Sequence, residues 1–499
     1  MLNKLNIKHN AVLIIVFCFS TILRLIGITS ADLWRDEAFS VRTADQSLGR
    51  TIEIIAKDTA PPLHSILLHF WIKLFGVGEL SVRLPSLIFG LAALIIFIKF
   101  AQLFFKTRRN VLLATVLFAI NPVLIWYSQE ARAYSMLVFF AIASLYYSLL
   151  IIKEKEFNKK NVLLLFITTI LGLYTHNLFI FIAFFNYLIA LIFTFGTINL
   201  KTILTKHRKF MLRLSAIYAL AGIIYLPWFI IMLKQLKTVS EGGFWLHLSL
   251  IRDPIVTIGM IYSGHYFDNG NNLNIITASL LGVTGALLLI ASTRIALKRS
   301  TPLRAAVLVW FWGIIFTVWL YSFKTSFFYI RYLLFLIPPA LLLSILTLDR
   351  LKKRAQTVFL LIILVIISTT SILISAQVSY IPGSKENMSA LVRDLNIQDG
   401  DLILHADAFS HHAFKLYSSD DCLIYNPDNN IPYYAGLSVI EESDYYRQTE
   451  IDDYNRVWVV YLWGQREEVT NELEKNYYMS ETYNYDGNLH MELWEKIAQ

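Results

Sequence analysis

Two adjacent carboxylates, Asp36 and Glu37, follow the first apolar segment of the chain, in the stretch WRDEAF. A carboxylate held at a membrane surface can act as a general base or as a ligand of a metal ion. The same two residues could instead form the first turn of a helix, where the backbone amides favour acidic side chains. Taken alone, the pair leaves both interpretations open.

Further polar residues lie between or beside later apolar segments. Glu130 and Arg132 share the short stretch WYSQEARAY, and because residues two apart do not face each other on a helix, we expect their partners elsewhere. His176 follows in YTHN, where a single histidine could also be a packing residue. Arg331 and Tyr332 begin another apolar segment, where an arginine could hold a lipid phosphate or extend to the membrane interface.

The composition identifies the elements that must hold these residues. Of 499 residues, 56% are hydrophobic and only 16% are charged, against roughly 25% charged in ordinary soluble domains. The mean hydropathy is +0.54. Because apolar runs of about 20 residues recur, the sequence predicts a polytopic α-helical membrane protein and excludes a single soluble core.

The formal net charge of +8 conceals two different parts. Residues 381–499 hold 8 Lys+Arg against 22 Asp+Glu, whereas residues 1–380 hold 36 against 14. A basic membrane part joined to an acidic tail argues against a nucleic-acid partner. The two cysteines, Cys18 and Cys422, lie in different parts, and we expect no disulfide framework.

The distribution of Lys and Arg predicts the topology. Apolar length places eleven spans, whose approximate bounds are 11–29, 85–105, 111–126, 134–152, 161–175, 178–196, 213–232, 274–293, 305–322, 329–347 and 356–376. Basic clusters follow each even-numbered span, which places the N-terminus in the cytoplasm and the tail outside. No clear cleavage site follows the first span, and we interpret it as a retained helix.

This topology places the candidate residues on the extracytoplasmic side. The segments expected there are the loop 30–84, the turns 126–134, 174–177 and 324–332, the loop 233–273 and the tail. Within the first loop, residues 61–76 begin with two prolines and predict a helix at the membrane interface. We therefore expect a membrane domain at 1–380 and an extracytoplasmic domain at 381–499.

The tail has the pattern of a small α/β domain. The stretches DLILHA and RVWVVYLW are typical of buried strands, and SKENMSALVRDLN and QREEVTNELEKN are typical of helices. Three histidines in HADAFSHH are close enough in sequence to raise the question of a metal site, but we expect ordinary surface histidines there.

The order and spacing of these blocks resemble a known class of enzymes. The stretches LWRDEAFS, DTAPPLHSILLHFW, NPVLIWYSQEARAY, LGLYTHNLF and FYIRYLLFLIPPALL look like the polytopic GT-C glycosyltransferases. In particular they resemble the bacterial family related to the protein O-mannosyltransferases and to the transferases that add aminoarabinose to lipid A. The resemblance covers roughly residues 10–350 and implies the GT-C fold, with a small extracytoplasmic α/β domain after it.

The resemblance implies roles for the residues that match its motifs. Asp36 matches the aspartate regarded as the catalytic base, and Glu37 matches the acid that follows it. Glu130 matches the second acidic position, with Arg132 beside it. The resemblance thus implies that Asp36, Glu37 and Glu130 are catalytic and that Arg132 binds substrate.

Further substrate-binding positions follow from the same resemblance. His176 matches the histidine of a YTH motif, and Arg331 with Tyr332 matches a place where a lipid phosphate could be held. Members of the class often carry a basic residue or a histidine just before the proline pair, whereas this chain has Ala60 and, in a different register, His64. Phosphate and metal binding in this loop are therefore open, and we expect no cofactor other than a divalent metal ion.

The implied reaction moves a sugar from a polyprenyl-phosphate carrier to a lipid, glycan or protein acceptor, at the outer face of a bacterial plasma membrane. Such a donor has no nucleotide, which agrees with the lack of a G-x-G-x-x-G fingerprint. A single displacement predicts inversion at the anomeric carbon.

Two other classes compete with this interpretation. A multi-span transporter or lipid flippase would explain the many spans, but it predicts internal repeats and broken helices near the midplane, which the sequence does not show. A non-catalytic scaffold that displays the acidic tail leaves the ordered polar blocks unexplained.

Overall fold

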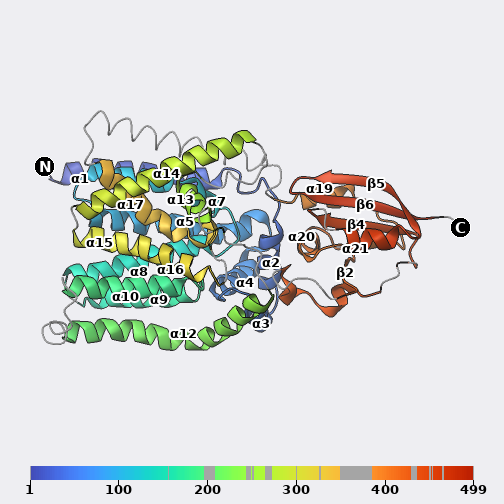
Figure 1. The fold of residues 1–499 in the computed structure, drawn as a ribbon, viewed down its shortest axis with the longest axis horizontal. Coiled ribbons are helices and arrows are strands. Elements are labelled where there is room, and N and C mark those ends of the chain that lie inside the picture. The colour runs from blue at the N-terminus through green and yellow to red at the C-terminus, as the bar shows by residue number, and fades with distance from the viewer. Residues whose placement is uncertain are drawn as a thin grey trace. The chain divides into compact units, whose positions relative to one another are not determined.

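The computed structural model groups the chain into two compact units (Figure 1). It describes residues 2–154, 157–195, 208–242, 249, 252–263, 272–298, 301–324, 328–348, 385–428, 435–448, 451, 453–463 and 466–497. The helical unit consists of the described residues of Met1–Ile26, Thr59–His64 and Arg83–Ala376. The loop–tail unit consists of those of Gly27–Asp58, Ser65–Val82 and Gln377–Gln499. Most of the long loop after the first apolar segment thus folds with the tail.

Long apolar helices make up the helical unit. They are α1 (Leu2–Leu25), α5 (Glu79–Phe104), α6 (Arg108–Ala119), α7 (Pro122–Trp126), α8 (Tyr134–Glu154), α9 (Lys159–Leu173), α10 (Phe179–Phe195), α12 (Arg208–Gly242), α13 (Arg252–Ser263), α14 (Asn272–Lys298), α15 (Pro302–Leu308), α16 (Ile314–Tyr321) and α17 (Ile337–Leu348). α8 packs against α9 and α10, and α14 packs against α13 and α17. The packing buries large rings such as Phe97, Phe179 and Phe335.

Helices overlap each of the first ten predicted spans, and the eleventh, 356–376, lies outside the described residues. Among the described residues, four helical segments are long and apolar enough to cross a membrane: Glu79–Phe104, Tyr134–Glu154, Arg208–Ser240 and Pro302–Tyr321. The prediction of a polytopic α-helical membrane protein is confirmed. The number of spans and the orientation of the termini stay predictions.

A proline-led helix start positions the turn that carries Glu130. Pro122 opens α7, where its missing amide proton costs no helical hydrogen bond, and Asn121 caps the helix by accepting the Leu124 amide at 3.1 Å. The side-chain nitrogen of Asn121, Nδ2, donates to the Ile261 carbonyl in α13 at 2.8 Å. The short helix α7 is thereby tied to its neighbour before the chain turns into α8.

The predicted span at 329–347 is wrong at its start. Residues 330–336 form two short 3₁₀ turns, and the helix begins only at Ile337. Pro338 and Pro339 occupy its first turn, which is the part of a helix that tolerates residues without an amide proton. Arg331 and Tyr332 therefore lie in a 3₁₀ turn that precedes the helix.

The loop–tail unit contains a six-stranded sheet in the order β3-β2-β1-β4-β6-β5. Its strands are β1 (Leu402–His405), β2 (Leu423–Tyr425), β3 (Tyr445–Tyr446), β4 (Arg456–Leu462), β5 (Tyr477–Tyr485) and β6 (Leu489–Lys496). β1 pairs in parallel with β2 and β4, and β2 with β3, whereas β6 is antiparallel to β4 and β5. The strands predicted in DLILHA and RVWVVYLW are confirmed.

Some of the helices of the loop–tail unit pack on the two faces of this sheet. The α-helices of the unit are α2 (Arg35–Ala44), α3 (Leu48–Lys57), α4 (Leu63–Phe75, whose first two residues belong to the helical unit), α19 (Met388–Asp394), α20 (Ala408–Tyr417) and α21 (Glu467–Leu473). Successive residues of β4 point into two apolar cores: Trp458 packs with Phe414 of α20, and Val459 packs with Leu473 of α21. Ala38 of α2 belongs to the first of these cores. α2 is therefore part of the folded core of the tail.

One predicted helix of the tail begins later than its pattern indicates. In SKENMSALVRDLN the helix α19 starts at Met388, and Asn387 caps it by accepting the Ala390 amide at 3.2 Å. Lys385 and Glu386 therefore precede the helix, and their side chains make contacts outside it.

Candidate functional site

Asp36 lies in the first turn of α2. Its side chain is half-buried, and its backbone carbonyl accepts a hydrogen bond from Ser40 Oγ at 2.9 Å. The residue before the helix, Trp34, makes no side-chain cap. Because the first amides of a helix have no partner within it, those of α2 need acceptors from elsewhere.

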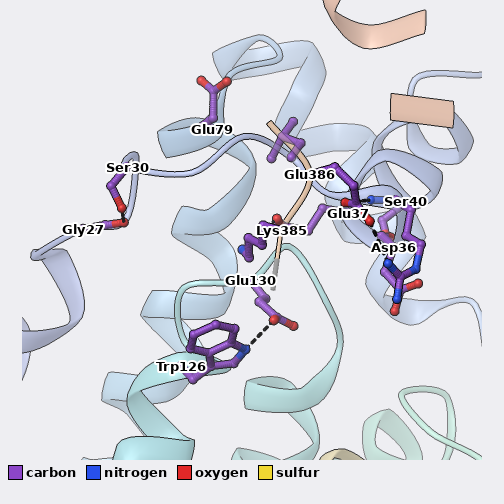
Figure 2. A network of polar contacts seen from close by, with 12 residues as sticks. Gly27, Ser30, Asp36, Glu37, Ser40, Glu79, Trp126, Glu130, Lys385 and Glu386 are labelled. Atoms are coloured by element: carbon purple, nitrogen blue, oxygen red, sulfur yellow. Dashed lines mark hydrogen bonds and ion pairs between the residues drawn. The ribbon is translucent and has the colours of Figure 1, made fainter. Parts of the chain in front are cut away.

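Glu386 of the tail supplies the missing cap (Figure 2). Its Oε2 accepts the Arg35 amide at 3.1 Å, and its Oε1 accepts from Arg35 Nη1 at 2.6 Å. The Glu386 side chain is 1% exposed. A carboxylate is favoured at a helix start by the amide protons and by the helix dipole. The tail thus fixes the residue at which α2 begins.

Glu37 is fully buried and pairs with Lys385 (Figure 2). Lys385 Nζ donates to Glu37 Oε2 at 3.0 Å, and the two side chains are 9% and 0% exposed. A buried carboxylate needs such a countercharge. Glu37 therefore has a structural partner in the tail, and its catalytic role stays a prediction.

The loop also caps a helix of the tail. Asp32 Oδ2 accepts the Ser389 amide in the first turn of α19 at 2.6 Å. Just after it, the Leu33 amide donates to Tyr417 Oη at 2.7 Å. We call the two contacts, Glu386 on α2 and Asp32 on α19, the reciprocal caps.

Three histidines of the tail, His405, His411 and His412, are buried, so the expectation of surface histidines is wrong. Arg42 in the last turn of α2 donates to His412 Nδ1 at 2.9 Å, and His412 Nε2 donates to the Ala435 carbonyl at 2.9 Å. Since a carbonyl only accepts, the proton is assigned to Nε2. Burial lowers the pKa of His405 and His412 to about 3, and these rings are neutral near pH 7. Across the described ranges, no group of three or more His, Cys, Asp or Glu residues could hold a metal ion.

Glu130 lies in the turn between α7 and α8 of the helical unit (Figure 2). Its Oε1 accepts from Trp126 Nε1 at 2.6 Å, and the residue is only 3% exposed. Its backbone carbonyl accepts the Arg132 amide at 2.8 Å. Gln129 holds the same turn by donating to two backbone carbonyls at the end of α1, at 3.1 and 2.7 Å. The turn is therefore a fixed structure that presents an acidic and a basic side chain.

Three turns that the predicted topology places outside meet within the helical unit. The ring of His176 lies 5.8 Å from that of Tyr332 and 6.5 Å from that of Tyr134. The guanidinium of Arg132 lies 5.9 Å from the centre of the Tyr134 ring, and Arg331 donates to Tyr332 Oη at 3.2 Å. Residues far apart in the sequence thus form one polar cluster at the ends of the helices.

Both arginines of this cluster act on His176. Burial lowers the pKa of His176 to about 4, and the positive charges of Arg132 and Arg331 act in the same direction. The imidazole is therefore neutral near pH 7, and the positive charge of the cluster belongs to the two guanidinium groups.

His64 joins the same cluster from the loop. The Leu63 amide donates to the Tyr174 carbonyl at 3.0 Å, which ties this part of the loop to the turn between α9 and α10. Burial, followed by the charge of Arg132, lowers the pKa of His64 to about 3. The sequence did not show whether His64 takes part in the site, because its register differs from that of the matching residue in the family. The structure places it near Arg132.

The residues predicted for the site fall into two sets, one in each unit. Asp36 and Glu37 belong to the loop–tail unit, and the helical unit holds His64, Glu130, Arg132, His176, Arg331 and Tyr332. Sequence reasoning missed Lys385 and Glu386. A lysine next to a glutamate in an acidic tail carries no local signal of partners 348 and 351 positions away.

Residues 59–233 match the family model described as dolichyl-phosphate-mannose-protein mannosyltransferase. A comparison with curated protein sequences found no match.

Solved structures share the fold over nearly the whole chain. ArnT from Cupriavidus metallidurans matches with a TM-score of 0.63 at 10% identity, over 96% of this chain and 97% of that chain. ArnT bound to undecaprenyl phosphate matches with a TM-score of 0.61 at 11% identity, over the same shares. The oligosaccharyltransferase AglB from Archaeoglobus fulgidus matches with 0.57 at 14% identity, over 97% of this chain and 74% of that chain. The predicted GT-C fold and the resemblance to GT-C glycosyltransferases are thereby confirmed.

The buried histidines predict acid sensitivity. The pKa of His405 and His412 is about 3 in the folded chain against an ordinary 6.5, so their contribution to stability is present above pH 6.5 and is lost as the pH falls. When the pH falls from 7 to 5, each of these two histidines lowers the free energy of unfolding by about 2 kcal/mol. Burial raises the pKa of Asp407 to about 6. Protonation of this carboxyl in the folded chain therefore raises the free energy of unfolding by about 1 kcal/mol over the same interval and offsets part of the loss.

Thermal unfolding of the full chain in detergent, followed at pH 7 and pH 5, measures this loss. His412→Gln keeps a donor for the Ala435 carbonyl and is expected to recover about 2 kcal/mol of it. Gln398→Ala, at an exposed residue without a titratable side chain, is the control and leaves the pH dependence unchanged. An unaltered pH dependence in His412→Gln would contradict a neutral buried ring.

Proposed function

We propose that this chain is a glycosyltransferase that moves a sugar from a polyprenyl-phosphate carrier to a hydroxyl of a lipid, glycan or protein acceptor. The observation that carries the proposal is the gathering of Arg132 and Arg331 beside a neutral His176, at the ends of apolar helices. Guanidinium groups bind phosphate oxygens strongly and with defined geometry. The family match over residues 59–233 and the fold shared with ArnT, which has been solved with undecaprenyl phosphate, support it.

Asp36 is the proposed general base. The acceptor hydroxyl loses its proton as its oxygen attacks the anomeric carbon, and the Asp36 carboxylate takes that proton. Glu37 is the weaker candidate because it is fully buried in a pair with Lys385, whereas Asp36 is only half-buried.

Arg132 and Arg331 are proposed to stabilise the leaving group. The bond between the anomeric carbon and the carrier phosphate oxygen breaks, and its electron pair passes to the phosphate, whose charge the guanidinium groups offset. His64, His176 and Tyr332 are proposed to line the phosphate site. Attack from the opposite face in one step inverts the anomeric configuration.

Glu130 is proposed as a second catalytic carboxylate, held in place by Trp126. We propose no cofactor other than a divalent metal ion, which would offset negative charge on the carrier phosphate, and the turnover assay repeated with EDTA tests whether it is needed. The proposed setting is a bacterial plasma membrane, with a cytoplasmic N-terminus and the tail outside.

Asp36→Asn is expected to lower kcat by about 10²- to 10⁴-fold with little change in the KM for the donor, because the amide cannot accept the proton. The measurement is release of polyprenyl phosphate by purified protein, with a panel of polyprenyl-phosphate sugars and crude membrane lipids as acceptor. Glu53→Gln, at an exposed carboxylate of α3, is the control and keeps wild-type turnover. Equal turnover by Asp36→Asn and wild type would remove Asp36 as the base.

Arg331→Gln is expected to raise the KM for the donor by about 10- to 100-fold, because a charge-assisted contact to phosphate is lost. The same assay, run over a range of donor concentrations, measures it. Lys209→Gln removes an exposed positive charge from α12 and serves as the matched control. An unchanged donor KM in Arg331→Gln would contradict a phosphate contact at this position.

A further inference from the structure

The first turn of α2 carries three charged side chains in a row. Arg35, Asp36 and Glu37 are consecutive, and Trp34 provides no side-chain cap. Consecutive helical residues point about 100° apart around the axis, so these side chains do not pair along one face. Groups from another segment can therefore contribute to fixing this turn.

Two consecutive residues of the tail meet this need. Glu386 binds both the amide and the guanidinium of Arg35, at 3.1 and 2.6 Å, while Lys385 binds Glu37 at 3.0 Å. These contacts lie on either side of Asp36 in the sequence. Because residues 35 and 37 are each tied to the tail, the start and the rotation of the helix are fixed, and so is the direction of the side chain between them.

We propose that Lys385 and Glu386 are positioning residues for Asp36, and that the tail is required for transfer because it supplies them. The inference rests on the proposed function, since it takes Asp36 as the base. Neither residue contacts substrate, because both act through α2. Reaction rates depend steeply on such geometry, and a displacement of about 1 Å at a reacting group can cost about 10²-fold in rate.

The contacts of Lys385 and Glu386 with α2 are buried, so that their loss is expected to disturb the helix start. The side chains of Glu37, Glu386 and Lys385 are 0%, 1% and 9% exposed. A buried carboxylate that loses its partner must be neutralised or must move toward water, and either change disturbs the turn. The pair of Lys57 with Glu53 in α3 is 60% and 50% exposed and carries no such penalty. It is the matched control within the same unit.

Arg35 has a further support from the end of β4. Its guanidinium lies 4.4 Å from the ring centre of Trp463 and 4.9 Å from that of Trp34, both within the range of a cation–π contact. Trp463 has a φ of 53°, a left-handed conformation that a bulky residue rarely adopts. The strained backbone places this indole against Arg35 and helps to hold the same turn.

Steady-state kinetics of the full chain in detergent test the proposal, with release of polyprenyl phosphate as the readout. Lys385→Met and Glu386→Ala are each expected to lower kcat at least tenfold and to leave the donor KM unchanged, because no substrate contact is lost. Lys385→Arg keeps a positive charge that can pair with Glu37 and is expected to keep most of the wild-type kcat that Lys385→Met loses. Lys57→Met is expected to match wild type.

The outcomes separate this proposal from the proposed function. If wild type releases no carrier phosphate, or Asp36→Asn keeps full activity, the proposed function or its base is wrong and the positioning proposal falls with it. If Asp36→Asn is impaired while Lys385→Met and Glu386→Ala keep wild-type kcat, only the positioning proposal is wrong. A rise in donor KM with unchanged kcat would overturn it as well.

Thermal unfolding of each variant shows whether a loss of activity comes from a chain that is no longer folded. Where Glu386→Ala does not fold, Glu386→Gln replaces it, because the amide oxygen still accepts the Arg35 amide but pairs only weakly with its guanidinium. Glu386→Gln is expected to lower kcat severalfold at unchanged donor KM. Full kcat in a folded Glu386→Gln would overturn the role of Glu386.

Discussion

The loop–tail unit depends on one constraint, which is that each of two helix starts is completed by a residue from the other segment. Asp32 of the loop accepts a first-turn amide of α19, and Glu386 of the tail accepts the first amide of α2. The first amides of a helix have no partner within it, and buried amides are rarely left unpaired. The loop that carries Asp36, the proposed base, thus obtains a fixed geometry from a sheet domain far along the chain, with Ala38 packed into that domain's core.

The helical unit holds two arginine side chains at the ends of apolar helices, each beside an aromatic ring. The guanidinium groups of Arg132 and Arg331 lie 5.9 and 5.1 Å from the rings of Tyr134 and Tyr332. Aromatic faces attract cations without adding a negative charge. His176 is neutral beside them because burial and the same two arginines lower its pKa. The cluster brings two guanidinium groups to one place, which suits the lipid-linked phosphate of the proposed donor.

The parts of this structure that were predictable are those set by local pattern. Long apolar runs such as those of α5 and α8 have few alternatives to a membrane helix, and apolar strands such as β4 are recognisable by their side chains. The start of α17 was not predictable from hydropathy, because the residues before Pro338 are as apolar as the helix itself. The three tail histidines were placed on the surface by their polarity, yet His412 is buried because Arg42 and a backbone carbonyl satisfy both of its nitrogens. The pairing of Lys385 with Glu37 joins residues 348 positions apart, and no local pattern encodes it.

Hydrogen exchange of the backbone amides of α2 tests the central claim most directly, in wild type and in Glu386→Ala. If Glu386 completes this helix start, the variant is predicted to exchange the first-turn amides of α2, beginning with Arg35, at least tenfold faster. The amides of α3 are predicted to be unaffected, because Ser47 of the same segment caps that helix by accepting the Arg50 amide. Unchanged exchange in α2, or an equal increase in α2 and α3, would contradict the claim that the tail holds the turn that carries Asp36.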